Sequence, residues 1–128
     1  MKHASLTDQI IKAAFKVHNI LGFGFLEKVY QNAMSVELER SGLEVAKECA
    51  TDVYYEDVLV GQYFADLIVE HKVILELKAV KTITNIHEVQ LVNYLKATGI
   101  EVGLLINFGH SVEIKRKVMD RSNPIIYQ

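Results

Sequence analysis

Residues 58–80 most constrain how this chain can fold, because they hold two successive runs rich in β-branched side chains. The runs Val58–Val69 and Val73–Val80 have the length and composition of paired strands. The polar turn Glu70-His71-Lys72 stands between them, as expected of an antiparallel hairpin. The sequence therefore predicts a β-sheet that includes this hairpin.

The remaining elements alternate between helical and strand patterns. Apolar residues recur at helical spacing in three segments, Leu6–Ile20, Phe25–Arg40 and Ile86–Thr98. Further strands are expected at Leu43–Val45, Thr51–Tyr55, Val102–Phe108 and, in preference to a helix, Val112–Val118. Ser5-Leu6-Thr7-Asp8 resembles a capping box, and Thr84 or Asn85 would cap the third helix. This order predicts an α/β (α+β) fold, a central mixed β-sheet flanked by helices.

Length and charge limit the classes of protein to consider. The chain has 128 residues without a linker or repeat, so residues 1–128 are expected to form a single domain. The lone proline, Pro124, lies near the end. A net charge of −2 argues against avid, nonspecific duplex binding but leaves room for a local basic strip. The basic cluster Lys115, Arg116, Lys117 and Arg121 is either such a strip or a solvated face.

The composition also indicates a cellular location. The N-terminal segment MKHASLTDQI lacks an apolar signal core, and no apolar run is long enough to span a bilayer. The single cysteine, Cys49, cannot form an internal disulfide or a thiolate cluster for zinc. These features favour a cytoplasmic protein with no membrane partner.

Charged residues interrupt the apolar stretch ADLIVEHKVILELKAV at Asp66, Glu76 and Lys78. Because side chains alternate along a strand, one face of Val73–Val80 is wholly apolar, and Glu76 and Lys78 are neighbours on the other face. Charges on an apolar surface are costly to bury unless they are paired or bound to something. These charges are therefore expected to be partly sheltered and to have partners.

The length of the hairpin loop decides whether Asp66 joins the other two charges. A two-residue loop at His71-Lys72 would turn Asp66 to the opposite face. A three-residue loop, Glu70-His71-Lys72, or a β-bulge would place Asp66 opposite Glu76. A site made of all three charges therefore requires an odd loop or a bulge.

Two carboxylates that meet in this way repel each other unless a cation or a proton intervenes. Lys78 can offset one negative charge, whereas a divalent metal ion can offset both. Oxygen ligands without nearby thiolates favour Mg²⁺ or Mn²⁺ over zinc. The structural alternative is a buried Asp–Lys or Glu–Lys ion pair without a catalytic role.

Three motifs together resemble a known superfamily. Asp66 followed, after nine intervening residues, by Glu76-Leu77-Lys78 resembles the PD-(D/E)XK nuclease motif, although Ala65 stands where the motif's name has proline. The segment Gly24–Tyr30 matches the signature of the GxxExxY proteins, which are assigned to that superfamily. Gln90–Tyr94 is similar to the QxxxY element of some members. The resemblance runs from about Leu6 to Val118.

This resemblance implies a restriction-endonuclease-like core and a Mg²⁺-dependent nuclease that hydrolyses phosphodiester bonds, in DNA more often than in RNA. On the superfamily pattern, Asp66 and Glu76 would ligate Mg²⁺ or Mn²⁺, together with the backbone carbonyl of Leu77. Lys78 would orient or activate the attacking water and stabilise developing negative charge.

Further residues receive roles from the same resemblance. Glu27 would ligate the metal directly, bind it through water or complete a second metal site, unless it is an ordinary exposed helix residue. Gln90 would hold the water or a phosphate, and Tyr94 would orient Gln90 or contact the nucleic-acid backbone. Tyr30 is expected to pack and to support the site with its hydroxyl. His87 is interpreted as a surface histidine and His18 as a brace of the glycine turn.

Two rival interpretations remain open at the level of sequence. One is a catalytically inactive nuclease-fold module that binds nucleic acid or a protein partner, which the acidic net charge favours. The other is a structural homo-oligomer in which the three charges form only ion pairs. A homodimer would suit cleavage of both strands of a duplex, but no motif indicates one.

Overall fold

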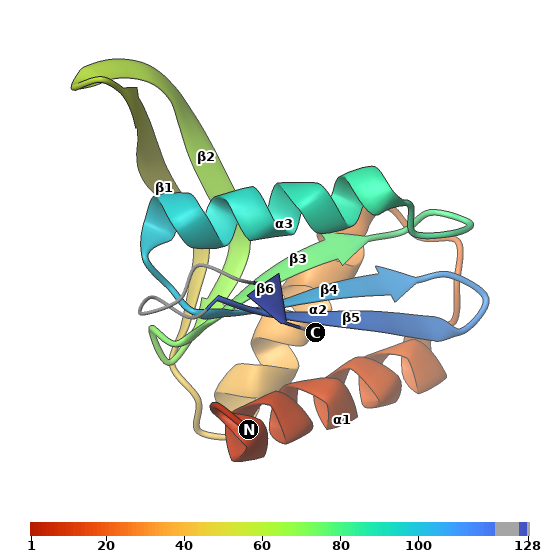
Figure 1. Ribbon diagram of the computed structural model, residues 1–128. Coiled ribbons are helices and arrows are strands. Elements are labelled where there is room, and N and C mark those ends of the chain that lie inside the picture. The colour runs from red at the N-terminus through yellow and green to blue at the C-terminus, as the bar shows by residue number, and fades with distance from the viewer. Residues whose placement is uncertain (120–125, 128) are drawn as a thin grey trace.

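The computed structural model describes residues 1–119 and 126–127 as three helices and six strands (Figure 1). The helices are α1 (Ala4–Leu21), α2 (Glu27–Arg40) and α3 (Asn85–Thr98). The strands are β1 (Val45–Tyr55), β2 (Val58–Val69), β3 (Val73–Lys78), β4 (Val102–Phe108), β5 (Val112–Met119) and β6 (Ile126–Tyr127). Arg121 and Pro124 lie outside the described residues. None of the described helices is long and apolar enough to cross a membrane.

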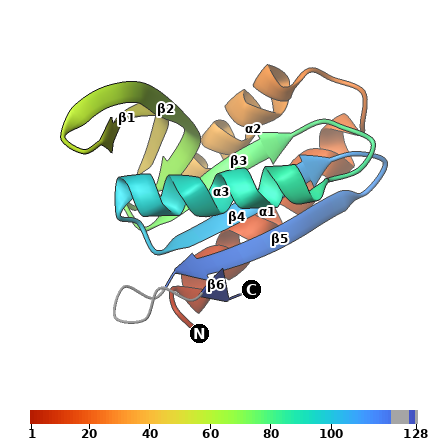
Figure 2. The same cartoon turned by 45° about the horizontal axis from the view of Figure 1, so that its top comes forward.

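The strands form one mixed sheet in the order β1-β2-β3-β4-β5-β6. Strands β3 and β4 are parallel and are connected through α3, whereas the other neighbouring strands are antiparallel. Helices α1 and α2 cover one face of the sheet, and α3 crosses the other (Figures 1 and 2). The predicted α+β fold with a central mixed sheet and flanking helices is confirmed.

Alternation along β3 divides its side chains between two cores. Leu75 and Leu77 pack with α1 and α2. Ile74 packs with α3, on the same face of β3 as Glu76. The predicted apolar face of this strand is therefore the face toward α1 and α2, and the charges lie on the face toward α3.

The loop between β2 and β3 has the three residues that a combined site requires. Val69 pairs with Val73, which leaves Glu70, His71 and Lys72 in the turn. Glu70 and His71 both have positive φ, at 54° and 56°, and the Lys72 N–H donates to the Val69 carbonyl at 3.0 Å. This odd loop places Asp66 on the same sheet face as Glu76.

The β1–β2 hairpin is strongly bent, and its far half projects past α3 (Figures 1 and 2). Lys47 pairs with Leu67 and Cys49 with Ala65, so Glu48 and Asp66 drop out of the register, and a second irregularity lies between Val53 and Tyr54. Glu48 has a positive φ of 50°. In place of the predicted strands Leu43–Val45 and Thr51–Tyr55 there is one strand, β1, which pairs with β2 on both sides of Glu48, and Leu43 and Glu44 lie before it.

The capping predictions had mixed outcomes. Helix α1 begins at Ala4 after His3, whose side chain makes no capping hydrogen bond, so the predicted capping box is wrong. The buried Thr7 hydroxyl donates instead to the Ala4 carbonyl at 3.1 Å. Thr84 does precede α3, and its N–H donates to His87 Nδ1 at 3.3 Å. His87 therefore has a local role in capping the helix.

The basic cluster near the C-terminus is neither one solvated face nor one strip. Lys117 is buried and pairs with Glu88 of α3 at 2.9 Å. Arg116 points to the other side of the sheet, where its Nη1 donates to Thr7 Oγ1 at 3.1 Å. Strand alternation separates neighbours that a sequence plot groups together, so both interpretations of the cluster are wrong for these two residues.

Candidate active site

Asp66 and Leu77 meet where β2 leaves β3. Leu67 and Leu75 are the last residues that pair between β2 and β3. Past this pair, a side chain replaces the backbone partner, because Asp66 Oδ2 accepts the Leu77 N–H at 2.7 Å. Since the N–H and C=O of one strand residue point to the same side, the Leu77 carbonyl also faces the gap that β2 leaves. A carboxylate and a backbone carbonyl therefore converge on one edge of β3.

Glu76 is buried beside Asp66, with 8% of its surface exposed. Burial, followed by the negative charge of Asp66, raises the pKa of Glu76 to about 8. Burial also raises the pKa of Asp66, which the Leu77 N–H and the charge of Lys78 oppose. Two sheltered carboxyls with raised pKa values form a site that favours a cation or a proton.

Lys78 is near this pair without being bound to it. Its positive charge lowers the pKa of both Asp66 and Glu76. It forms no ion pair within 4.0 Å with any described side chain. The structural alternative, an ion pair between Lys78 and Asp66 or Glu76, is therefore not formed. The half-buried Lys78 can instead contact a ligand beside the two carboxylates.

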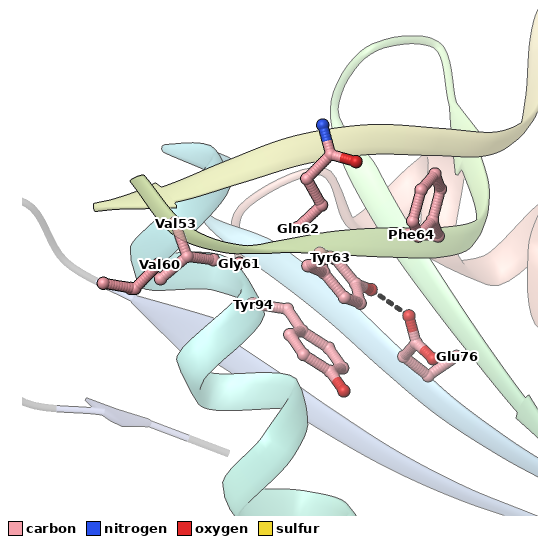
Figure 3. Close-up of a pocket in the computed structure, with 8 residues that line it drawn as sticks. All are labelled: Val53, Val60, Gly61, Gln62, Tyr63, Phe64, Glu76 and Tyr94. Atoms are coloured by element: carbon pink, nitrogen blue, oxygen red, sulfur yellow. Dashed lines mark hydrogen bonds between the residues drawn. The ribbon is translucent and has the colours of Figure 1, made fainter. Parts of the chain in front are cut away.

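Tyr63 is a site residue that the sequence analysis did not identify. Its hydroxyl donates a hydrogen bond to Glu76 Oε1, and its ring stacks on Tyr94 with centroids 3.4 Å apart and planes at 14° (Figure 3). Simple alternation from Asp66 turns Tyr63 to the opposite face. The bend at Asp66 reverses this, because Ala65 and Tyr63 pack in the core of α3 while Leu67 packs on the other side.

Gln31 connects α2 to the acidic site, which the sequence analysis also missed. Its Nε2 donates to the Asp66 carbonyl at 2.9 Å, and its side chain is buried. Glu27 lies one turn earlier, exposed at the first turn of α2. In the described part of the chain, no three His, Cys, Asp or Glu side chains come close enough together to hold a metal ion. The role of Glu27 as a ligand therefore stays a prediction.

Tyr30 packs as predicted, and its hydroxyl holds the glycine loop rather than the carboxylates. The hydroxyl donates to the Gly22 carbonyl at 2.7 Å and accepts the Phe25 N–H at 3.4 Å. Its ring stacks on Phe108 with centroids 4.5 Å apart. Any support that Tyr30 gives to the site therefore passes through the loop before Glu27.

The remaining predicted residues lie at the edges of the site. Gln90 is exposed on α3, one turn before Tyr94. His18 contacts the Gly109 carbonyl through Nε2 at 2.8 Å, and its own backbone carbonyl accepts the Gly22 N–H at 2.7 Å, so it braces both the turn after β4 and the glycine loop. The acidic pair, Lys78 and Tyr94 are thus gathered on the α3 side, with Gln90 at the surface.

The raised pKa of Glu76 predicts how stability depends on pH. The folded pKa of about 8 lies above the ordinary value of 4.5, so the folded state binds this proton more tightly than the unfolded state. That stabilisation is fully present below about pH 4.5 and is lost as the pH rises through 8. Glu76→Gln is therefore expected to be more stable than the wild type by roughly 1–3 kcal/mol at pH 9, and by much less at pH 4.5.

Thermal unfolding in EDTA at the two pH values measures this difference. Glu56→Gln, in the exposed turn between β1 and β2, is the matched control and should show no such dependence. An equal stability difference at both pH values for Glu76→Gln would contradict the burial of an ionisable group there.

Comparison with known proteins identifies the superfamily of the chain. The model of the PD-(D/E)XK nuclease superfamily matches residues 4–118, and the chain belongs to that superfamily. Nucleases of this superfamily generally use divalent metal ions. No curated protein matches the chain.

Two solved structures share the fold. The protein SSO0001 is similar over 90% of this chain and 58% of its own, with 18% identity and a TM-score of 0.59. An alkaline exonuclease from Laribacter hongkongensis is similar over 95% of this chain and 73% of its own, with 14% identity and a TM-score of 0.52. The chain thus spans little more than half the length of the first of these, and the likeness concerns the fold.

Proposed function

We propose that this chain is a divalent-metal-dependent nuclease that cleaves phosphodiester bonds, with DNA a better substrate than RNA. The observation that carries this proposal is the sheltered pair Asp66 and Glu76, with Lys78 nearby and in no ion pair within 4.0 Å with a described carboxylate. The segment Gly24–Tyr30 further supports a place in the GxxExxY branch of the superfamily.

The donor set fits a hard cation. Asp66 and Glu76 would hold Mg²⁺ or Mn²⁺ with the Leu77 carbonyl, and water would fill the other positions, as is common for Mg²⁺. When bound, the ion polarises a phosphodiester and lowers the pKa of its water. The carboxyls are suited to this because burial raises the pKa of both, and the negative charge of Asp66 raises that of Glu76 further.

Besides the metal ion, Lys78 would supply positive charge at the site. Its ammonium would hold the attacking water and stabilise the negative charge that develops on the phosphate oxygens. Glu27 would add a further ligand, directly or through water, and Gln90 would hold the water or a phosphate. Tyr94 would support Gln90 or contact the nucleic-acid backbone, and Tyr30 would steady the loop before Glu27 through Gly22.

Calorimetric titration of the protein with Mg²⁺ and with Mn²⁺, paired with a cleavage assay on DNA and RNA, tests this proposal. Saturable binding and metal-dependent cleavage of at least one substrate are expected. Salt-sensitive nucleic-acid binding without cleavage would instead support the inactive binding module. The absence of saturable metal binding would reject the enzyme.

Tyr63→Phe tests whether Tyr63 positions Glu76. The substitution removes only the hydroxyl that donates to Glu76 Oε1 and keeps the ring that stacks on Tyr94. Loss of such a supporting hydrogen bond lowers metal affinity by about 10–100-fold in other proteins, and the same range is expected here. Tyr54→Phe, at the exposed end of the hairpin, is the control. Unchanged metal affinity in Tyr63→Phe would limit Tyr63 to a packing role.

A further inference from the structure

A pocket of about 530 Å³ lies between the β1–β2 hairpin and α3 and reaches Glu76 (Figure 3). Its volume is within the range of about 300–1,000 Å³ that is typical of small-molecule sites. The residues that line it are Val53, Val60, Gly61, Gln62, Tyr63, Phe64, Glu76 and Tyr94. The proposed metal site involves only one end of this pocket, at Glu76.

Gly61 leaves the middle of the pocket open. It lies directly opposite Val53, so both face α3, where Val53 packs. A Cβ added at Gly61 would meet no atom within 4 Å, and its φ is not positive, so the backbone does not require glycine. Glycine inside a strand often marks a bulge or a close approach by a ligand. The bulge is present here, since the register shift beside Gly61 leaves Val60 without a partner in the strand pairing.

The walls of the pocket suit a flat, weakly polar ring. The buried Tyr63 and the half-buried Tyr94, whose rings stack on each other, line the pocket, and Val53 and Val60 extend the apolar lining along the hairpin (Figure 3). Glu76 is the only charged residue among the described ones that line it. A phosphate would find no cation in such a pocket, whereas a nucleobase has the flat apolar faces that stack on aromatic side chains.

We propose that this pocket receives one unpaired nucleobase of the strand whose phosphate lies at Asp66 and Glu76. The inference rests on the proposed nuclease function and specifies its substrate class, which is single-stranded nucleic acid or the frayed end of a duplex. A base stacked inside a duplex has both faces covered, so it reaches such a pocket only after leaving the stack. The β1–β2 hairpin supplies the wall opposite α3 (Figure 3).

Substitution of Gly61 tests this proposal without touching the metal site. In the series Gly61→Ala, Gly61→Val and Gly61→Leu, the side chain fills increasing volume on the face of Val53. The fold should tolerate all three, because an added Cβ meets no atom within 4 Å and the larger side chains extend into the pocket that Gly61 lines. Val58→Leu is the control, since Val58 is exposed on the same hairpin and does not line the pocket.

Fluorescence anisotropy in EDTA measures binding of a labelled 12-nucleotide single strand and of a blunt duplex of the same sequence. The wild type is expected to prefer the single strand, and Gly61→Leu to lose on the order of 10-fold in affinity for it. Gly61→Ala should lose less, and Val58→Leu nothing. Equal affinity for duplex and single strand, binding of neither, or wild-type affinity in Gly61→Leu would each overturn the proposal.

Calorimetry with Mg²⁺ separates this inference from the proposed function. All three Gly61 variants should keep the metal affinity of the wild type. If the wild type binds metal and cleaves, but Gly61→Leu cleaves the single strand equally well, the pocket inference fails while the nuclease stands. If the wild type binds no metal but Gly61→Leu alone loses single-strand binding, the nuclease fails while the pocket stands.

Discussion

Lys78→Ala is expected to lower kcat for metal-dependent cleavage by about 100–1,000-fold, the effect of removing one donor that stabilises transition-state charge. Lys78 faces the acidic pair and makes no ion pair within 4.0 Å with a described residue, so the fold does not depend on that contact. Single-turnover cleavage at saturating Mg²⁺ measures the loss directly.

The control for this substitution is Lys72→Ala, an exposed lysine in the turn at the other end of β3. It should keep wild-type cleavage, and both variants should unfold at nearly the same temperature as the wild type. Mg²⁺ affinity should persist in Lys78→Ala, since the lysine is not a ligand. Cleavage within a few-fold of the wild type would remove Lys78 from the chemistry.

Asp66→Asn is expected to lower Mg²⁺ affinity by more than about 100-fold, beyond the range that loss of a merely supporting residue produces. The amide removes the negative charge but keeps an oxygen that can accept the Leu77 N–H, so the local fold is preserved. Cleavage should fall in parallel, because the same carboxylate would hold the metal. Isothermal titration calorimetry measures the affinity.

Asp52→Asn is the matched control, because Asp52 lies exposed on the same hairpin and bonds only with hairpin residues in the described contacts, Gln62 and Tyr54. Its metal affinity should equal that of the wild type. A Kd for Mg²⁺ in Asp66→Asn within a few-fold of the wild-type value would exclude Asp66 as a ligand. Glu76 would then have to bind the metal with a different second ligand.

Much of the fold could be predicted because its patterns are local. Helical periodicity predicted α2 and α3 to within two residues at each end, and alternation predicted the apolar face of β3. Capping was less predictable, since the Thr7 hydroxyl bonds within the buried first turn of α1 instead of capping its end. Ser and Thr hydroxyls can bond to several nearby backbone groups with similar energy, so the sequence alone does not show which of these bonds forms.

The site was predictable only in part, for a geometric reason. The motif singled out Asp66, Glu76 and Lys78, and alternation required a loop with an odd number of residues for all three to share one face. The three-residue turn meets that requirement. Tyr63 could not be found in this way, because counting by twos from Asp66 turns it away from Glu76. Only the bend at Asp66 and Glu48 brings its hydroxyl to the carboxylate.

The sequence by itself determined which residues alternate, which face of β3 is apolar, and which charges stand close along the strands. These properties depend on neighbours in the chain. The tertiary structure decided that β2 bends away from β3, that Tyr63 and Gln31 reach the acidic pair, and that Gly61 opens a pocket beside it. A bend and a pocket arise from packing between a hairpin and a helix that lie far apart in sequence, and no local pattern records that packing.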